Sequence, residues 1–238
     1  MRRALSEAIH HTGGRRACQK PLAEQPLMRN VLADLALEVE AATLLGFRLA
    51  CAVDDEEAGD EAARLLVRIA TPVAKYWNCK RVVGVVHEAL ECHGGNGFIE
   101  EGPMARLYRE APLNGIWEGS GNIIALDVLR AASKSPATVP ALIDEVRRAK
   151  GGDKRLDRAI ARLETDLREP AEQESRARRV AEMMAVALQA SLLVRYSPSA
   201  MADAFCATRL EGGGGAVYGN LPAGIDQRAI VERATMHR

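Results

Sequence analysis

The sequence has few aromatic residues and no net charge, and both features argue against a surface made for binding nucleic acid or membranes. Aromatic side chains make up 4% of the 238 residues, and lysines plus arginines equal aspartates plus glutamates at 32 each. Because the chain has no net charge, it has no overall electrostatic attraction to nucleic acid or to a membrane surface. Aromatic residues also do not alternate with basic ones, as they do where single-stranded nucleic acid stacks on a protein.

Paired cysteines and long apolar runs are also missing. The five cysteines are scattered without a C-x-x-C pair, which indicates reduced thiols of a cytoplasmic protein rather than a disulfide framework or a zinc site. No apolar run approaches the ~18 residues that cross a bilayer, so we expect no membrane span. His87, Cys92 and His93 are close in sequence, but no carboxylate or second cysteine stands at ligand spacing, and we expect no metal.

Apolar residues recur at helical spacing along most of the chain. The first 16 residues are basic and superficially resemble a transit peptide. We interpret them instead as part of the folded domain, with a helix that ends at Gly13-Gly14. Pro72 predicts a kink or a fresh helix start, and Asp54–Asp60 a loop. No strand pattern is convincing, so we expect an all-α fold. Apolar spacing predicts further helices at 27–53, 61–92, 103–110, 122–132, 140–150, 154–168, 170–195, 198–209 and 225–233.

Residues 91–127 combine glycines with a carboxylate beside an aromatic ring. Glycines cluster at 94, 95 and 97 and again at 119 and 121, where a backbone could turn sharply or approach a ligand closely. Glu118 follows Trp117 directly, and desolvation beside an apolar ring can raise a carboxyl pKa toward the range of a general base. Taken singly, however, the glycines are typical of a helix stop, and Trp-Glu of a core residue beside a surface residue.

The order of these pieces resembles the acyl-CoA dehydrogenase family. That family has a (Q/E)xxGGxG(Y/F) segment followed by RD or RE and then by YEGT or WEGS. The variant WEGSGN, with LYREAP upstream, is most similar to the branch that includes DNA alkylation response proteins of the AidB type. The corresponding residues here are Glu91, Gly94, Gly95, Gly97 and Phe98, then Arg109-Glu110, then Trp117-Glu118-Gly119-Ser120.

The resemblance implies a fold and a domain organisation. Residues 1–133 would form the family's C-terminal helical bundle, and 134–238 a smaller helical extension of the AidB-like kind. In the family this domain forms a subunit interface in tetramers, so we expect a homo-oligomer. The family's N-terminal helical domain and β-domain have no counterpart in this sequence, which looks like a C-terminal portion with an incomplete flavin site.

The same resemblance implies roles for individual residues in the FAD-dependent α,β-dehydrogenation of an acyl-CoA. Glu118 would be the α-proton base, with Trp117 and Gly119 at the substrate. Arg16 would pair with the flavin pyrophosphate of a neighbouring subunit; RACQKPL matches the family's RAFGKPL, except that Cys18 and Gln19 replace Phe and Gly. The remaining cofactor contacts would be Glu91, Gly94, Gly95, Gly97, Ser120 and Asn122.

Two alternatives remain open from the sequence. One is an AidB-like module that binds duplex DNA without sequence preference through Arg147, Arg148 and Arg155. Acidic residues are interleaved with this cluster, which is typical of a solvated helix face. The other is an inactive helical remnant that only oligomerises.

Overall fold

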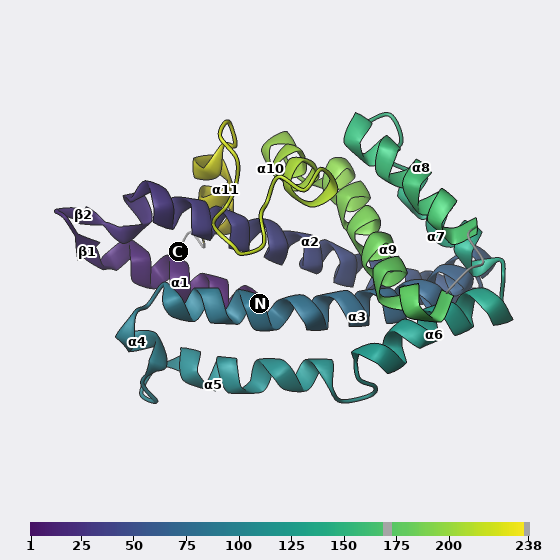
Figure 1. The fold of residues 1–238 in the computed structure, drawn as a ribbon, viewed down its shortest axis with the longest axis horizontal. Coiled ribbons are helices and arrows are strands. Elements are labelled where there is room, and N and C mark those ends of the chain that lie inside the picture. Colours follow the sequence, from purple (N-terminus) through teal and green to yellow (C-terminus); the bar gives the residue numbers. More distant parts are fainter. Residues whose placement is uncertain (169–172, 236–238) are drawn as a thin grey trace. The chain divides into compact units, whose positions relative to one another are not determined.

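The structure is a computed structural model that describes residues 1–168 and 173–235. The regular secondary structure of the described residues is helical apart from one short hairpin (Figure 1), so the all-α prediction is confirmed. Its contacts define two compact units, one made of Met1–Glu40, Cys79–Asn114 and Ser199–Arg238, and one of Ala41–Asn78 and Gly115–Pro198. We call them unit 1 and unit 2 and describe each by itself. The predicted division at residue 133 concerns sequence relationship and stays a prediction.

Unit 1 combines both ends of the chain with parts of two long helices. Its core includes Leu5, Leu35, Val85, Met104 and Phe205, all 2% exposed or less. The extension therefore packs into the same core as the first helix. The elements are α1 (Arg2–Gly14), β1 (Arg16–Ala17), β2 (Lys20–Pro21), a 3-10 turn (Leu22–Glu24), the first part of α2 (Pro26–Glu57), the last part of α3 (Glu61–Glu91), α4 (Gly95–Phe98), α5 (Pro103–Glu110), α10 (Ser199–Phe205), a π-helix (Cys206–Leu210) and α11 (Gln227–Ala234).

Unit 2 is built around α9 (Gln173–Tyr196). Every residue from 184 to 193 is buried, because α6, α7 and α8 all pack against this helix. The methionine and leucine stripe of α9 is therefore core, as its spacing predicts. The unit also contains the second part of α2 and the first part of α3. A 3-10 turn (Ala111–Gly115) leads from unit 1 into unit 2 along the chain. Its other helices are α6 (Gly121–Lys134), α7 (Thr138–Arg147) and α8 (Lys154–Arg168).

Three local features differ from the sequence predictions. Pro72 neither ends a helix nor starts one, because α3 continues through it. The acidic stretch predicted as a loop is helical as far as Glu57, at the end of α2. Residues 16–21 form an antiparallel hairpin, with Arg16 opposite Pro21, where we expected no strand. The predicted start of the helix at 170 lies outside the described residues.

A buried ion cluster ties the extension to α2 and α3 within unit 1. Arg209 of the π-helix donates to Asp34 and, at 3.2 Å, to Glu38. Arg81 donates twice to Glu38, each time at 2.9 Å, and the backbone N–H of Gly219 donates to Asp34 at 2.9 Å. Burial alone would raise the pKa of Glu38, but bonds from the two arginines outweigh it and lower the pKa. Two buried carboxylates are thus neutralised by two arginines.

Within the described ranges, no helix is both long and apolar enough to cross a membrane.

Candidate functional site

The glycines that follow α3 have distinct structural roles. Gly94 has φ +59° and ψ −142°, a conformation that only glycine adopts readily. A Cβ on Gly97 would lie 2.4 Å from the carbonyl oxygen of Leu90, so close packing with the end of α3 requires glycine there. Around Gly94 and Gly95 an added Cβ would meet no described atom within 4 Å. Gly97 therefore serves the turn, while Gly94 and Gly95 expose backbone that a ligand could approach.

Arg16 lies on the hairpin and is exposed. Cys18 and Gln19 have φ values of +47° and +67°, which fit a two-residue turn with both central residues in the left-handed region. Arg16 Nη2 donates to the backbone oxygen of Gln19 across this turn. Glu91, the last residue of α3, is also exposed and lies 3.8 Å from His87 Nε2. Like the three glycines, Arg16 and Glu91 belong to unit 1.

The segment Trp117–Asn122 belongs to unit 2 and forms an irregular turn at the start of α6. Glu118 has φ +54° and Gly119 has φ +114°. Trp117 is 55% exposed and Glu118 is exposed, so neither is a core residue. Ser120 occupies the N-cap position of α6, but among the described atoms its side chain accepts no capping bond. The N–H groups of the first turn are therefore left without their usual side-chain acceptor.

Two cations from other helices hold this segment. Lys75 Nζ of α3 donates to the backbone oxygen of Trp117 at 2.9 Å. Arg178 Nε of α9 donates to Oδ1 of Asn122 at 2.8 Å. Sequence reasoning missed both residues, since they lie 42 and 56 positions away from their partners and no local pattern marks them.

The three arginines predicted to meet DNA are paired with carboxylates. Arg147 lies 2.7 Å from Glu164, and Arg155 lies 2.6 Å from Asp153. Arg148 lies 3.2 Å from Glu145, which is buried on α7. Each cation is thus compensated locally, as on a solvated face of mixed charge.

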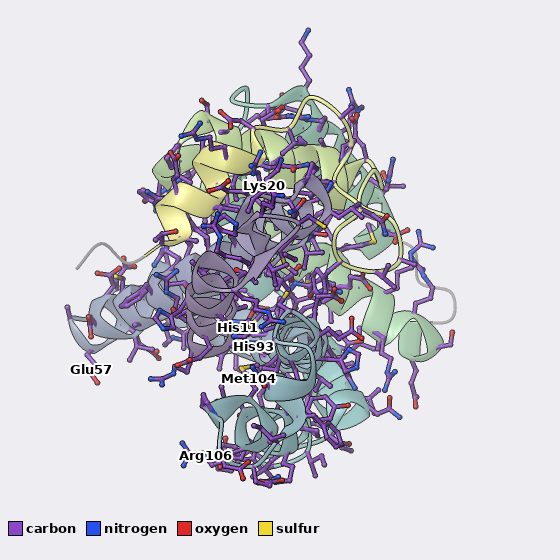
Figure 2. All side chains as sticks on the ribbon, turned by 90° about the vertical axis from the view of Figure 1, so that its left-hand side faces the viewer. His11, Lys20, Glu57, His93, Met104 and Arg106 are labelled. Atoms are coloured by element: carbon purple, nitrogen blue, oxygen red, sulfur yellow. The ribbon has the colours of Figure 1, made fainter. Side chains whose placement is uncertain are left out.

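A stacked histidine pair lies beside the Gly94 turn. The rings of His11 and His93 have centroids 4.6 Å apart (Figure 2), and His93 Nδ1 is 2.7 Å from the backbone oxygen of Ala89. Burial first, and then the nearby His93 and Arg15, lower the pKa of His11. Burial raises the pKa of the Cys92 thiol to about 12, so this cysteine stays protonated. Over the described residues, no group of three or more histidine, cysteine, aspartate or glutamate side chains could hold a metal ion.

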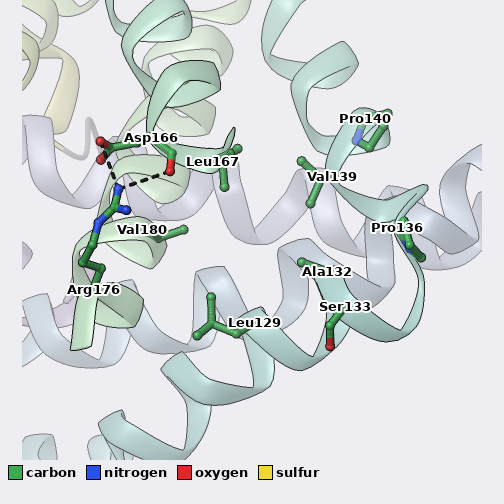
Figure 3. Close-up of a pocket in the computed structure, with 10 residues that line it drawn as sticks. All are labelled: Leu129, Ala132, Ser133, Pro136, Val139, Pro140, Asp166, Leu167, Arg176 and Val180. Atoms are coloured by element: carbon green, nitrogen blue, oxygen red, sulfur yellow. Dashed lines mark hydrogen bonds and ion pairs between the residues drawn. The ribbon is translucent and has the colours of Figure 1, made fainter. Parts of the chain in front are cut away.

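A cavity of about 420 Å³ lies in unit 2 among α6, α7, α8 and α9 (Figure 3). Its wall is mostly apolar, and the ion pair of Asp166 and Arg176, 3.1 Å apart, lies at one side. None of the predicted site residues lines it.

Comparison with known proteins assigns the chain to a family. Residues 1–133 match the family model described as acyl-CoA dehydrogenase, C-terminal domain. AidB of Escherichia coli K12, which carries the name of an acyl-CoA dehydrogenase, is 43% identical over 215 residues. That match covers 90% of this chain and 39% of AidB.

Solved structures agree with this assignment. ACDH-11 of Caenorhabditis elegans, in complex with C11-CoA, is similar with a TM-score of 0.81 and 26% identity over 87% of this chain and 40% of its own. An acyl-CoA dehydrogenase from Bacillus anthracis, complexed with FAD, has a TM-score of 0.69 over 100% of this chain and 50% of its own. At 18% identity this second likeness shows the fold alone. The chain spans about two fifths of the length of AidB and of ACDH-11. Since the family model matches more than half of the sequence, this protein belongs to the acyl-CoA dehydrogenase family.

Proposed function

We propose that the chain supplies the helical C-terminal portion of an FAD-dependent acyl-CoA dehydrogenase in which Glu118 is the α-proton base. The observation that carries the proposal is the backbone of Glu118, which holds an exposed carboxylate at φ +54° before α6. A left-handed conformation costs a non-glycine residue on the order of 1–3 kcal/mol, and such strain is concentrated at functional sites. This strained residue is the one that the family resemblance assigns to the base.

The reaction would proceed by removal of two hydrogens from neighbouring carbons. The Glu118 carboxylate takes the proton from the carbon beside the thioester carbonyl and becomes a neutral acid. The electron pair of that C–H bond forms the new double bond, and the hydrogen on the next carbon leaves as hydride. FAD, when bound, supplies the acceptor for this hydride. A positioned general base contributes roughly 10²–10⁴ in rate. The C11-CoA bound by the similar ACDH-11 supports an acyl-CoA as substrate.

The residues present fit parts of an FAD molecule. Gly94 and Gly95 expose backbone with space for a close approach. Ser120 and the first-turn N–H groups of α6 offer donors to an oxygen acceptor. Arg16 offers a planar guanidinium, which suits a diphosphate. Each of these groups would contact only one part of the cofactor, and we expect the 238-residue chain to retain little flavin when purified alone.

A fusion protein tests the proposal. The N-terminal portion of E. coli AidB that precedes the matched region would be joined to Met1, and the product purified beside the 238-residue chain. We expect the fusion to contain FAD and to lose its flavin absorbance when C11-CoA is added without oxygen. Glu118→Gln should keep the FAD content and slow this reduction by about 10²–10⁴.

Glu101→Gln is the matched control, because Glu101 is also exposed but lies outside the segment 117–122. It should reduce flavin at the rate of the unchanged fusion. Flavin reduction that is as fast in Glu118→Gln as in the control would overturn the assignment of the base. A fusion that binds FAD but is never reduced by an acyl-CoA would instead favour the inactive remnant.

Self-association is proposed for the chain itself. Helix α2 leaves Leu27 84% exposed and Phe47 69% exposed. Leu27 belongs to unit 1 and Phe47 to unit 2, and large apolar side chains that are exposed in this way are commonly covered by another chain. Light scattering at micromolar concentration should therefore show an oligomer, and a clean monomer would contradict this expectation.

Duplex DNA remains a partner implied only by the AidB-like resemblance. If it binds, affinity should fall steeply between 50 and 200 mM salt because of counterion release. Changing Arg147, Arg148 and Arg155 together to Glu should then abolish binding in a fluorescence-polarisation assay. Binding that survives this triple change would exclude the three arginines as the contact.

A further inference from the structure

The turn at Trp117–Asn122 needs support from outside its own residues. Glu118 and Gly119 both have positive φ, and the Ser120 hydroxyl makes no capping bond with any described group. Strained backbone of this kind persists only where surrounding groups over-determine it. The segment is also exposed at Trp117, Glu118 and Ser120, so burial does not fix it.

Lys75 and Arg178 contact residues that precede and follow Glu118 in the sequence. Lys75 Nζ holds the carbonyl of Trp117, which belongs to the peptide bond directly before Glu118, at 2.9 Å. Arg178 Nε holds the side chain of Asn122, in the first turn of α6, at 2.8 Å. Hydrogen bonds with a charged donor are roughly twice as strong as neutral ones.

We infer that Lys75 and Arg178 are positioning residues that set the orientation of Glu118 and Asn122. Their role in the reaction rests on the proposed function, whereas their effect on the conformation of the segment does not. Arg178 lies beyond the region that matches the family model, which ends at residue 133. The extension is therefore part of the site and not an appendage to it.

Each contact has a specific mechanical consequence. The Lys75 ammonium fixes the direction of the Trp117 carbonyl, and with it the peptide plane that precedes Glu118. This plane would have to rotate for φ of Glu118 to become negative. Arg178 is a donor only, so the atom of Asn122 that faces it must be the amide oxygen. The Asn122 Nδ2 group is thereby left to donate to an acceptor on a ligand. Without Arg178 the amide could flip and present its oxygen instead.

The first experiment uses the 238-residue chain and backbone order parameters from NMR relaxation. In the unchanged chain the amides of Glu118 and Gly119 should show rigid values of about 0.85. Lys75→Met and Arg178→Met should each lower the order parameters in the segment, to below about 0.6 at Glu118 for Lys75→Met. Lys75→Arg and Arg178→Lys keep a charged donor and should stay close to the unchanged chain.

Matched controls are Lys80→Met on α3 and Arg162→Met on α8, both at exposed positions outside the segment 117–122. These should leave the order parameters of Glu118 and Gly119 unchanged. Rigid values at Glu118 in both methionine variants would overturn the inference. So would a loss of order that the controls reproduce, because the effect would then be a general one.

The second experiment uses the AidB fusion described above. Lys75→Met and Arg178→Met should keep the FAD content and lower the rate of flavin reduction at saturating C11-CoA by about tenfold or more. The arginine and lysine replacements should restore most of that rate. An unchanged rate in both methionine variants would exclude a role in positioning Glu118. If instead the segment loosens in the first experiment while even the unchanged fusion is not reduced, the proposed function fails and the positioning role stands.

Discussion

Replacing Glu145 with glutamine tests the ion cluster that links three helices of unit 2. The carboxylate is buried on α7 and accepts two bonds from Arg48 of α2, at 2.9 and 3.0 Å. Arg195 of α9 donates a third at 2.8 Å. Burial alone would raise the pKa of Glu145, but the bonds from Arg48 and Arg195 outweigh it and lower the pKa from 4.5 to about 2.

The size of the effect follows from this pKa. A difference of about 2.5 between the unfolded and folded values corresponds to about 3 kcal/mol of stability at pH 7. Because the folded-state pKa is the lower one, this contribution is complete above pH 4.5 and is lost as the pH falls toward 2. About 2 kcal/mol should remain at pH 3.5. Glutamine also removes the carboxylate to which Arg48 and Arg195 both donate, and their side chains are only 16% and 12% exposed. We therefore expect Glu145→Gln to cost about 3–5 kcal/mol at pH 7.

Urea unfolding followed by tryptophan fluorescence measures this cost, since both tryptophans, Trp77 and Trp117, belong to unit 2. Asp144→Asn is the matched control: its side chain is 73% exposed and lies 3.7 Å from Arg147. An exposed pair of this kind contributes about 0–1 kcal/mol. The reasoning is refuted if Glu145→Gln costs no more than the control, or if its cost is the same at pH 7 and pH 3.5.

Two further predictions concern unit 1. Gln19→Gly should stabilise the protein by roughly 1 kcal/mol, because glycine adopts the φ of +67° in the hairpin turn without strain, and a lower midpoint in a thermal melt would contradict this. Burial, His93, Arg15 and His10 lower the pKa of His11, so the unfolded chain binds a proton more readily and stability should fall as the pH drops through 6.5. His11→Phe keeps a ring for stacking and should reduce this pH dependence in urea titrations at pH 7.5 and 5.5; an unchanged pH dependence would exclude His11 as its source.

The long helices were predictable from the sequence because apolar spacing continues over many turns. Residues 27–53 predict α2, which runs from Pro26 to Glu57. The hairpin was not predictable in this way, since two-residue strands are too short for alternation to be recognised. At Pro72 the prediction failed for a different reason. Proline disfavours a helix locally, yet this proline is buried inside α3. Tertiary contacts outweigh local preference at this position.

Some residues of the candidate site could likewise be predicted from the sequence, and others could not. The segment around Glu118 could be found from the sequence because its motif is contiguous. Lys75 and Arg178 could not, since each contacts the segment from a distant helix and neither stands in a pattern of its own. The positive φ of Glu118 also has no sequence signal, because left-handed backbone is predicted for glycine and asparagine rather than for glutamate.

The most direct test of Glu118 as the α-proton base is an isotope measurement on the AidB fusion. Anaerobic flavin reduction would be followed after mixing with C11-CoA that carries either hydrogen or deuterium on the carbon beside the thioester carbonyl. We predict that deuterium slows reduction in the unchanged fusion and that Glu118→Gln, with the same FAD content, is slower by about 10²–10⁴. A Glu118→Gln fusion that is reduced at the unchanged rate, with the same sensitivity to deuterium, would show that another group removes the proton.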